Sequence, residues 1–166
     1  MVLLTKNRET IIPKMICDHS LENTAHWLRA AGYDVQVSFF RLTESQLLDQ
    51  AIKQDRILLT NSANYGVDAE IDKRIIRFKT DNLYDQIKEI SSSLAIDWLY
   101  KPISRCMVCN TKLVELNISN WIELSKETQS NCVASHGCLC CKRIYWAGEQ
   151  INKMVGQLKM FKELDW

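Results

Sequence analysis

Two Cys-x-x-Cys pairs are the residues whose type and spacing most directly specify chemistry. Cys106 and Cys109 form the first pair, and Cys138 and Cys141 form the second. Each spacing places two thiolates on one tight turn, and two such turns facing each other supply the four ligands of a tetrahedral zinc site. Four thiolates leave the zinc ion no open position, so the predicted site is structural. The alternative is a set of ordinary buried cysteines.

Three other potential ligands lie beside the second pair, at Cys132, His136 and Cys140. We prefer Cys138 and Cys141 because their spacing repeats that of the first pair. The chain has seven cysteines, which is an odd number, and four of them have zinc-type spacing. This usage favours a reducing compartment over a disulfide scaffold, so we expect a cytoplasmic protein.

The composition is that of a soluble globular protein, because 46% of the 166 residues are hydrophobic and 25% are charged. This length accommodates one ordinary domain, or a small domain with a metal-stapled extension. The net charge of +1 does not predict nucleic-acid or membrane binding, so a basic surface would have to be a local patch. The first ten residues lack a signal-peptide pattern, and no apolar run reaches membrane-spanning length, so we expect no membrane partner.

The elements that must position the cysteines alternate between strands and helices over the first 100 residues. Short apolar runs predict strands at residues 14–17, 35–39, 56–60 and 74–78. Apolar residues at helical spacing predict helices that begin after Ser20, after Thr43 and at Leu83. We expect Ser20 and Thr43 to be N-caps, Gln46 to complete a capping box, and Gly32 to end the first helix. This alternation predicts an α/β fold with a mostly parallel sheet flanked by helices.

The pattern changes near Lys101, where cysteines, short strands and loops replace the alternation. The last segment has apolar residues on one helical face, at Ile151, Met154, Val155, Leu158 and Phe161. We therefore expect an α/β domain at residues 1–100, followed at residues 101–166 by a zinc ribbon and a terminal helix. This helix should pack either on the α/β part or on the ribbon.

Five stretches, taken in chain order, resemble the C-terminal domain of the Mut-seven exoribonuclease family. They are Ile16–Asp18, His26–Asp34, Arg56–Thr60, Ser104–Asn110 and Cys138–Trp146. The resemblance covers nearly the whole chain, and its most specific blocks are Ser-Arg-Cys-x-x-Cys-Asn and Cys-x-x-Cys-x-Arg-x-Tyr-Trp. It implies a PIN-like ribonuclease fold with a zinc ribbon held by four cysteines. A minimal form of this domain also occurs as a stand-alone prokaryotic protein.

The resemblance also implies a role with RNA. In animals this domain is appended to a 3′–5′ exoribonuclease domain of the DEDD type, in proteins linked to small-RNA pathways. The expected partners are single-stranded RNA, an exonuclease domain in the same polypeptide and a recruiting protein. The expected location is the cytoplasm, including RNA granules.

PIN-like nucleases hold one or two Mg²⁺ or Mn²⁺ ions with three or four carboxylates at one edge of the sheet. Asp18 matches the first acidic position of the family, and Glu44 can be aligned to the second. Ser62 and Asn64 stand where relatives carry further acids. Because neutral groups supply too little charge for a hard divalent ion, Asp18 and Glu44 are degenerate catalytic candidates.

A Mg²⁺ or Mn²⁺ site would need a third acid, which Asp68 or Asp72 could supply by folding back. The alternative role for Asp18 is to cap the helix that follows it, where the helix dipole favours a carboxylate.

Basic and aromatic side chains are the expected RNA contacts, since cations bind phosphates and aromatic rings stack on bases. The set is Arg29, Lys73, Arg74, Arg77, Lys79, Arg105, Lys142, Arg143, Tyr145 and Trp146. His26 shares a helix face with Arg29, and Lys101 leads into the ribbon. The alternative is that the cations are solvated surface and that Tyr145 and Trp146 pack against the ribbon.

Three functions are compatible with these features. The leading hypothesis is an RNA-binding accessory domain of a 3′–5′ exoribonuclease that is itself catalytically inactive. The second is a protein-interaction module that recruits the exonuclease, with the loop from Asn61 to Ile71 as its docking site. The third is a divalent-metal-dependent ribonuclease that uses Asp18.

Overall fold

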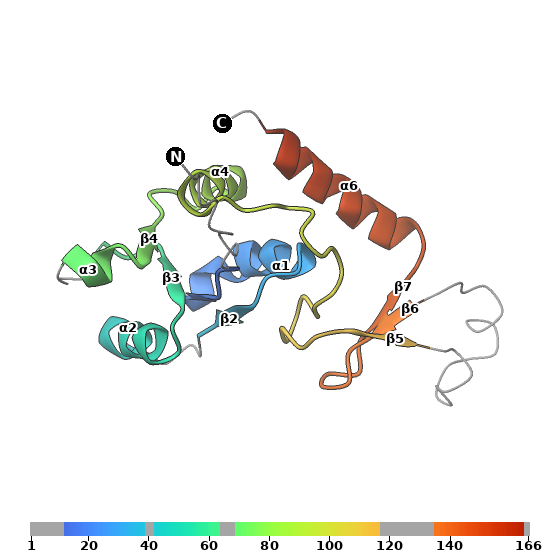
Figure 1. Ribbon diagram of the computed structural model, residues 1–166, viewed down its shortest axis with the longest axis horizontal. Helices are drawn as coiled ribbons and strands as arrows, with labels where there is room; N and C mark the ends of the chain where they lie inside the picture. Colours follow the sequence, from blue (N-terminus) through green and yellow to red (C-terminus); the bar gives the residue numbers. More distant parts are fainter. Residues whose placement is uncertain (1–11, 39–41, 64–68, 117–134, 165–166) are drawn as a thin grey trace, which may run out of the picture.

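The computed structural model describes residues 12–38, 42–63, 69–116 and 135–164 (Figure 1). Its main sheet has four parallel strands in the order β2-β1-β3-β4. They are β1 (Met15–Cys17), β2 (Val35–Val37), β3 (Ile57–Thr60) and β4 (Ile75–Arg77). The predicted α/β fold with a parallel sheet is therefore confirmed. Phe39, which the prediction placed in the second strand, lies outside the described residues.

Alternation along the strands explains why both faces of this sheet are covered. Met15 and Cys17 point into one apolar cluster, whereas Ile16 between them belongs to a second cluster on the other face. All three side chains are fully buried. A continuous apolar run is the expected signature of a parallel strand that is buried on both sides.

Helices supply the covering layers. They are α1 (Glu22–Ala30), α2 (Glu44–Lys53), α3 (Ala69–Asp72), α4 (Leu83–Leu94) and α6 (Glu149–Glu163), with a 3-10 turn η1 (His19–Leu21) before α1. Ala25 of α1 and Ile87 of α4 join the cluster of Met15, while Leu47 and Ala51 of α2 join that of Ile16. No helix within the described ranges is both long and apolar enough to cross a membrane.

The ends of α1 and α2 test the predicted caps. Thr43 and Gln46 form the expected capping box at the start of α2. Gly32 follows α1 with φ +103°, a conformation that favours glycine. A Cβ atom there would also lie 2.5 Å from the Lys101 carbonyl oxygen, so both the backbone angle and the available space require glycine. The predicted N-cap at Ser20 is wrong. Asp18 caps η1 instead, because its carboxylate accepts the Ser20 N–H at 2.8 Å.

The second sheet is antiparallel, in the order β5-β6-β7. Its strands are β5 (Val114–Leu116), β6 (Ser135–Gly137) and β7 (Ile144–Trp146). In Figure 1 this sheet lies at one end of the molecule, and α6 runs from it back toward α4. The architecture therefore matches the predicted order of an α/β part, a cysteine-bearing ribbon and a terminal helix.

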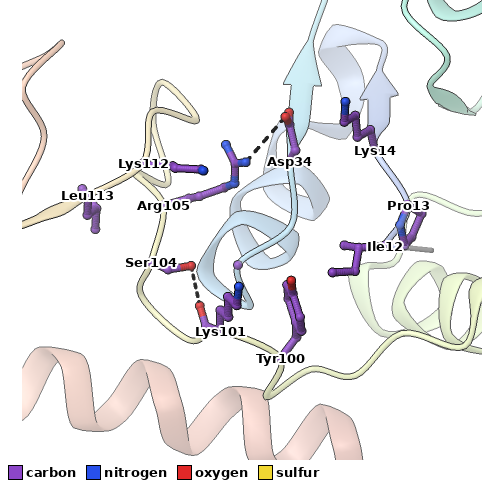
Figure 2. A pocket seen from close by; sticks show the side chains of 11 residues that line it. Ile12, Pro13, Lys14, Asp34, Tyr100, Lys101, Ser104, Arg105, Lys112 and Leu113 are labelled. Atoms are coloured by element: carbon purple, nitrogen blue, oxygen red, sulfur yellow. Dashed lines mark hydrogen bonds and ion pairs between the residues drawn. The ribbon is translucent and has the colours of Figure 1, made fainter. Parts of the chain in front are cut away.

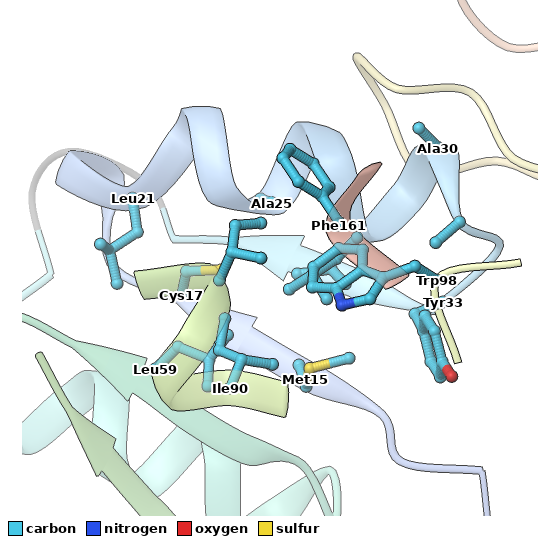
Figure 3. Packing of buried hydrophobic residues seen from close by; sticks show 14 of the residues in the cluster. Met15, Cys17, Leu21, Ala25, Ala30, Tyr33, Leu59, Ile90, Trp98 and Phe161 are labelled. Carbon is cyan, nitrogen blue, oxygen red and sulfur yellow. The ribbon is translucent and has the colours of Figure 1, made fainter. Parts of the chain in front are cut away.

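One apolar core connects the early and late parts of the chain. Phe161 of α6 packs edge-on against Trp98, with ring centroids 5.2 Å apart (Figure 3). It also packs edge-on against Trp27, with ring centroids 5.3 Å apart. Ile103 and Met107 join the same cluster. The backbone adds to this attachment, since the Ile103 N–H donates to the Ala30 carbonyl at 2.8 Å. The segment that carries the first cysteine pair is thus anchored at the end of α1.

Candidate metal centre and the two edges of the sheet

The four cysteines predicted from spacing lie together. The Sγ atoms of Cys106 and Cys141 are 3.5 Å apart, those of Cys109 and Cys138 are 3.3 Å apart, and all four lie within 4.8 Å of one another. Sulfurs bound tetrahedrally at about 2.3 Å from zinc would be separated by about 3.8 Å. The donor set therefore fits a metal ion such as zinc, with four thiolates and no open position.

The two cysteine turns have the same backbone geometry. In each, the carbonyl of the first cysteine accepts an N–H from four residues later, at 2.8 Å from Asn110 to Cys106 and 3.0 Å from Lys142 to Cys138. The N–H of each first cysteine donates in turn to the carbonyl five residues later, at 2.8 Å in both. Asn110 and Lys142 are both left-handed, with φ of 68° and 60°. These matched turns, which we call the first and second knuckle, bring the two thiolates of each pair to one side.

Tyr145 of β7 is tied to the first knuckle. Its hydroxyl accepts the Met107 N–H at 3.1 Å and lies 3.2 Å from the Cys106 Sγ. Burial, and then the neighbouring Cys106 thiol, raise the pKa of Tyr145, so the hydroxyl stays protonated at neutral pH. The half-buried ring also packs against the main core. This placement favours a packing role for Tyr145, while Trp146 is half-buried at the end of β7.

Arg29 is an interior residue. Only 4% of it is exposed, its Nε donates to the Val35 carbonyl at 2.8 Å, and its Nη1 donates to the Met107 and Val108 carbonyls at 3.0 and 2.9 Å. Burial lowers its pKa. Arg29 therefore joins α1 to β2 and to the first knuckle. This corrects the expectation that Arg29 contacts RNA, because its guanidinium is turned inward and occupied by carbonyls.

The carboxyl ends of the parallel strands meet at one edge of the sheet, as sheet topology requires. A depression of about 440 Å³ lies there, and both candidate acids, Asp18 after β1 and Glu44 at the start of α2, line it. The remaining polar lining comes from His19, Ser20, Ser38, Thr60, Asn61 and Ser62. We call this the carboxylate edge.

The candidate acids at the carboxylate edge accept hydrogen bonds from neutral groups. One oxygen of Asp18 accepts from the Thr60 hydroxyl at 2.9 Å and from the Asn61 N–H at 3.3 Å. The other accepts from the N–H and hydroxyl of Ser20. The Ser62 hydroxyl donates to Glu44. Both acids are therefore engaged in the hydrogen bonding of the fold, and the capping role considered for Asp18 is observed.

Asp81 is a carboxylate at this edge that the sequence prediction missed. Asn61 donates its side-chain amide to Asp81 at 2.9 Å and to the Ser20 hydroxyl at 3.3 Å. Asp81 follows β4, whereas the family pattern led us to expect further acids only after the third strand. An acid just beyond the fourth strand is the signal that could have found it, since all four strands end at this edge.

The structure does not gather these acids into a metal site. Within the described ranges, the cysteine set is the only group of three or more His, Cys, Asp or Glu side chains placed to hold an ion. Asp72 pairs instead with Arg77 at 2.8 Å. Asn64 and Asp68 lie outside the described residues, as does Cys132.

The predicted basic cluster is divided between the two edges of the sheet. Lys73 and Arg74 precede β4 and so lie at the edge formed by the amino ends of the strands, which we call the amino edge. Arg77 and Lys79 lie at the carboxylate edge. Lys73 pairs with Glu70 at 2.6 Å, and Arg74 pairs with Asp55 at 2.8 Å. The cluster is therefore two smaller groups, each partly neutralised.

The basic residues of the ribbon differ in exposure. Lys142 and Arg143 are exposed beside the second knuckle. Arg105 is 16% exposed, donates to the Asn110 carbonyl at 2.9 Å and lies 3.6 Å from an oxygen of Asp34. Cys140 and His136 lie outside the cysteine set.

Comparison with known proteins gives one result. The family model described as the Mut7-C RNAse domain matches residues 13–158. This span runs from just before β1 into α6 and contains both knuckles and both sheet edges. No curated protein and no solved structure gives a match.

Proposed function

The chain belongs to the Mut7-C RNase domain family, and we propose that it is an RNA-binding accessory domain without cleavage activity of its own. Family membership implies a function related to RNA processing. The observation that carries the finer proposal is the hydrogen bonding of Asp18, whose two oxygens accept from neutral groups of Thr60, Asn61 and Ser20. A hydrolytic Mg²⁺ site needs carboxylates that are free to bind the ion.

The zinc ribbon has a supporting role in this proposal. Zinc held by four thiolates would fix the two knuckles against each other and so order the segment between the α/β part and α6. Exposed Lys142 and Arg143 follow the second knuckle directly, which links the metal to a candidate RNA surface. We propose Trp146, Arg105, Lys73, Arg74, Arg77 and Lys79 as further contacts.

The larger setting is also a proposal. A separate 3′–5′ exoribonuclease domain in the same polypeptide would cut the RNA that this domain engages. The assembly would act in small-RNA pathways, in the cytoplasm or in RNA granules, with a recruiting protein as a further partner.

RNA binding can be tested by fluorescence anisotropy with labelled single-stranded RNA over a range of salt concentrations. We expect affinity to fall as salt rises, because phosphate contacts release counterions. Neutralising Lys142 and Arg143 together should weaken binding, whereas neutralising exposed Lys53 and Lys159, which lie away from the knuckles, should not. Equal affinity for all three proteins would show that the second knuckle does not contact RNA.

One observation favours a second function, that of a divalent-metal-dependent ribonuclease. Asp18, Glu44 and Asp81 all lie at the carboxylate edge, and Asn61 bridges the first and last of them. Three carboxylates are enough for an ion if the side chains move together. RNA cleavage in Mn²⁺ that is lost on Asp18→Asn would establish this activity.

A further inference from the structure

A basic pocket lies at the amino edge of the sheet, opposite the carboxylate edge. It has a volume of about 400 Å³, within the range of about 300–1,000 Å³ that is usual for ligand pockets. Lys14 comes from just before β1, and Lys101, Arg105 and Lys112 come from the segment around the first knuckle. In Figure 2, Lys14 is on one side, Arg105 and Lys112 on the other, and Tyr100 and Lys101 at the base.

Positive charge exceeds negative charge in this pocket. Among the described residues, Asp34 is the only carboxylate in its lining, against four cations. Asp34 is already bound by Arg56 and by the Asn110 side-chain amide, both at 2.8 Å. Burial would raise the pKa of Asp34, but hydrogen bonds from Arg56 and Asn110 outweigh it and hold the pKa below its usual value. Asp34 is therefore ionised, and two cations balance it: Arg56 outside the pocket, and Arg105 within it at 3.6 Å.

Among the described residues, the lysines of the pocket have no carboxylate partner and so can interact with an anionic ligand. Within the described ranges, no carboxylate forms an ion pair with Lys14, Lys101 or Lys112. The Lys101 ammonium lies 5.1 Å from the centre of the Tyr100 ring, which Tyr33 supports from a centroid distance of 5.4 Å. Several cations converging on a hollow favour a multiply charged oxyanion, because the concave surface focuses their field.

A second hollow continues the pocket along the same edge. It has a volume of about 650 Å³, shares Ile12, Pro13 and Lys14 with the first, and is bordered by Arg56, Lys73 and Arg74. Its lining also includes one carboxylate, Asp55, which pairs with Arg74 at 2.8 Å. Cations therefore follow the amino edge from Lys112, through Lys14, to Arg74. A chain of phosphates fits such a path better than a single small anion does.

We propose that this pocket binds phosphate groups of a single RNA strand, which then runs along the amino edge through the second hollow. The inference rests on the proposed RNA-binding function and specifies the site. Lysines act as point charges toward phosphates, while Ile12 and Leu113 give the pocket an apolar border suited to a ribose or base. The phosphates held in the pocket would lie across the sheet from Asp18, away from the candidate acids of the carboxylate edge.

The test uses the full chain and the double variant K14Q/K112Q. Both lysines are exposed and unpaired in the described structure, so the variant should fold. We expect RNA affinity to fall about tenfold. The slope of log affinity against log salt should become shallower by about 0.7 for each phosphate that the variant no longer neutralises. The control K53Q/K88Q removes two exposed lysines outside the pocket and should leave both quantities unchanged. The charge-retaining variant K14R/K112R should keep most of the affinity.

Binding of RNA and binding of adenosine monophosphate are both measured, because the pocket could hold phosphates of RNA or of a free nucleotide. Loss of RNA binding in K14Q/K112Q supports the proposal. If K14Q/K112Q loses adenosine monophosphate binding but still binds RNA, the proposal is overturned, because the pocket would then serve a free nucleotide. If K14Q/K112Q binds RNA like the wild type while the Lys142 and Arg143 variant does not, the pocket is refuted but the RNA-binding function stands. If the wild type binds no RNA, both proposals fail.

Discussion

At the scale of single residues, two buried arginines join segments that are distant in sequence. Arg29 donates hydrogen bonds to three backbone carbonyls, one in β2 and two in the first knuckle. Arg56, 9% exposed, pairs with Asp34 at 2.8 Å and also donates to the Met15 carbonyl at 3.1 Å. Planar guanidinium groups suit this task because they present several donors in fixed directions. Such buried cations are structural, and residue type alone does not distinguish them from the surface cations that we propose as RNA contacts.

The role of Arg29 can be tested by Arg29→Lys. A lysine keeps the charge but cannot reach carbonyls on both sides, so we expect a loss of about 2 kcal/mol in the free energy of unfolding. Urea denaturation measures this loss. RNA affinity of the folded fraction should be unchanged. The control Arg143→Lys, at an exposed position, should shift the unfolding free energy by less than about 0.5 kcal/mol. A stable Arg29→Lys protein with weakened RNA binding would contradict the structural role.

At the scale of elements, the two knuckles are the repeated unit. Their matched hydrogen bonds and left-handed residues follow from the Cys-x-x-Cys turn itself, which is why spacing alone could identify four ligands. The elements that carry them are remote, since the first knuckle follows the core segment after α4 and the second lies between β6 and β7. A shared metal ion would therefore hold β6 and β7 against the α/β part.

Metal binding can be tested by comparing Cys138→Ser with Cys140→Ser. Cys138 is buried within the set, whereas Cys140 is two residues away, exposed and outside it. We expect Cys140→Ser to retain one zinc ion per chain by elemental analysis, and Cys138→Ser to lose it. Chelation of the wild type should unfold the ribbon, because metal affinity is coupled to folding. If Cys138→Ser kept the ion and Cys140→Ser lost it, the ligand set would be wrong.

Most local features, and the meeting of the two cysteine pairs, were predictable from the sequence, whereas the long-range contacts of Arg29 and Asp81 were not. The four parallel strands, the Thr43 capping box and Gly32 follow from periodicity and from backbone preferences within a few residues. The burial of Arg29 could not be foreseen, because its partners come from residues 35, 107 and 108. The same reason hid Asp81, whose place depends on where β4 ends relative to β1.

At the scale of the whole molecule, the parallel sheet separates two chemically different edges. Acids paired with neutral donors lie at the carboxyl ends of the strands, and the basic pocket lies at the amino ends. The division of the basic cluster around β4 has the same cause, since residues before and after a strand reach opposite edges. The pocket itself combines residues from before β1 with others from after α4, so only the folded chain displays it. We propose that this separation would allow the domain to bind RNA without cutting it.

The central claim is most directly tested by one assay of labelled single-stranded RNA with the zinc-loaded full chain in Mn²⁺. Gel separation of the same reaction under native and denaturing conditions reports binding and product length together. We predict a retarded complex that weakens with salt, and RNA of unchanged length. Shortened RNA that persists after purification, and disappears with both Asp18→Asn and Asp81→Asn, would contradict the claim and make the carboxylate edge an active site.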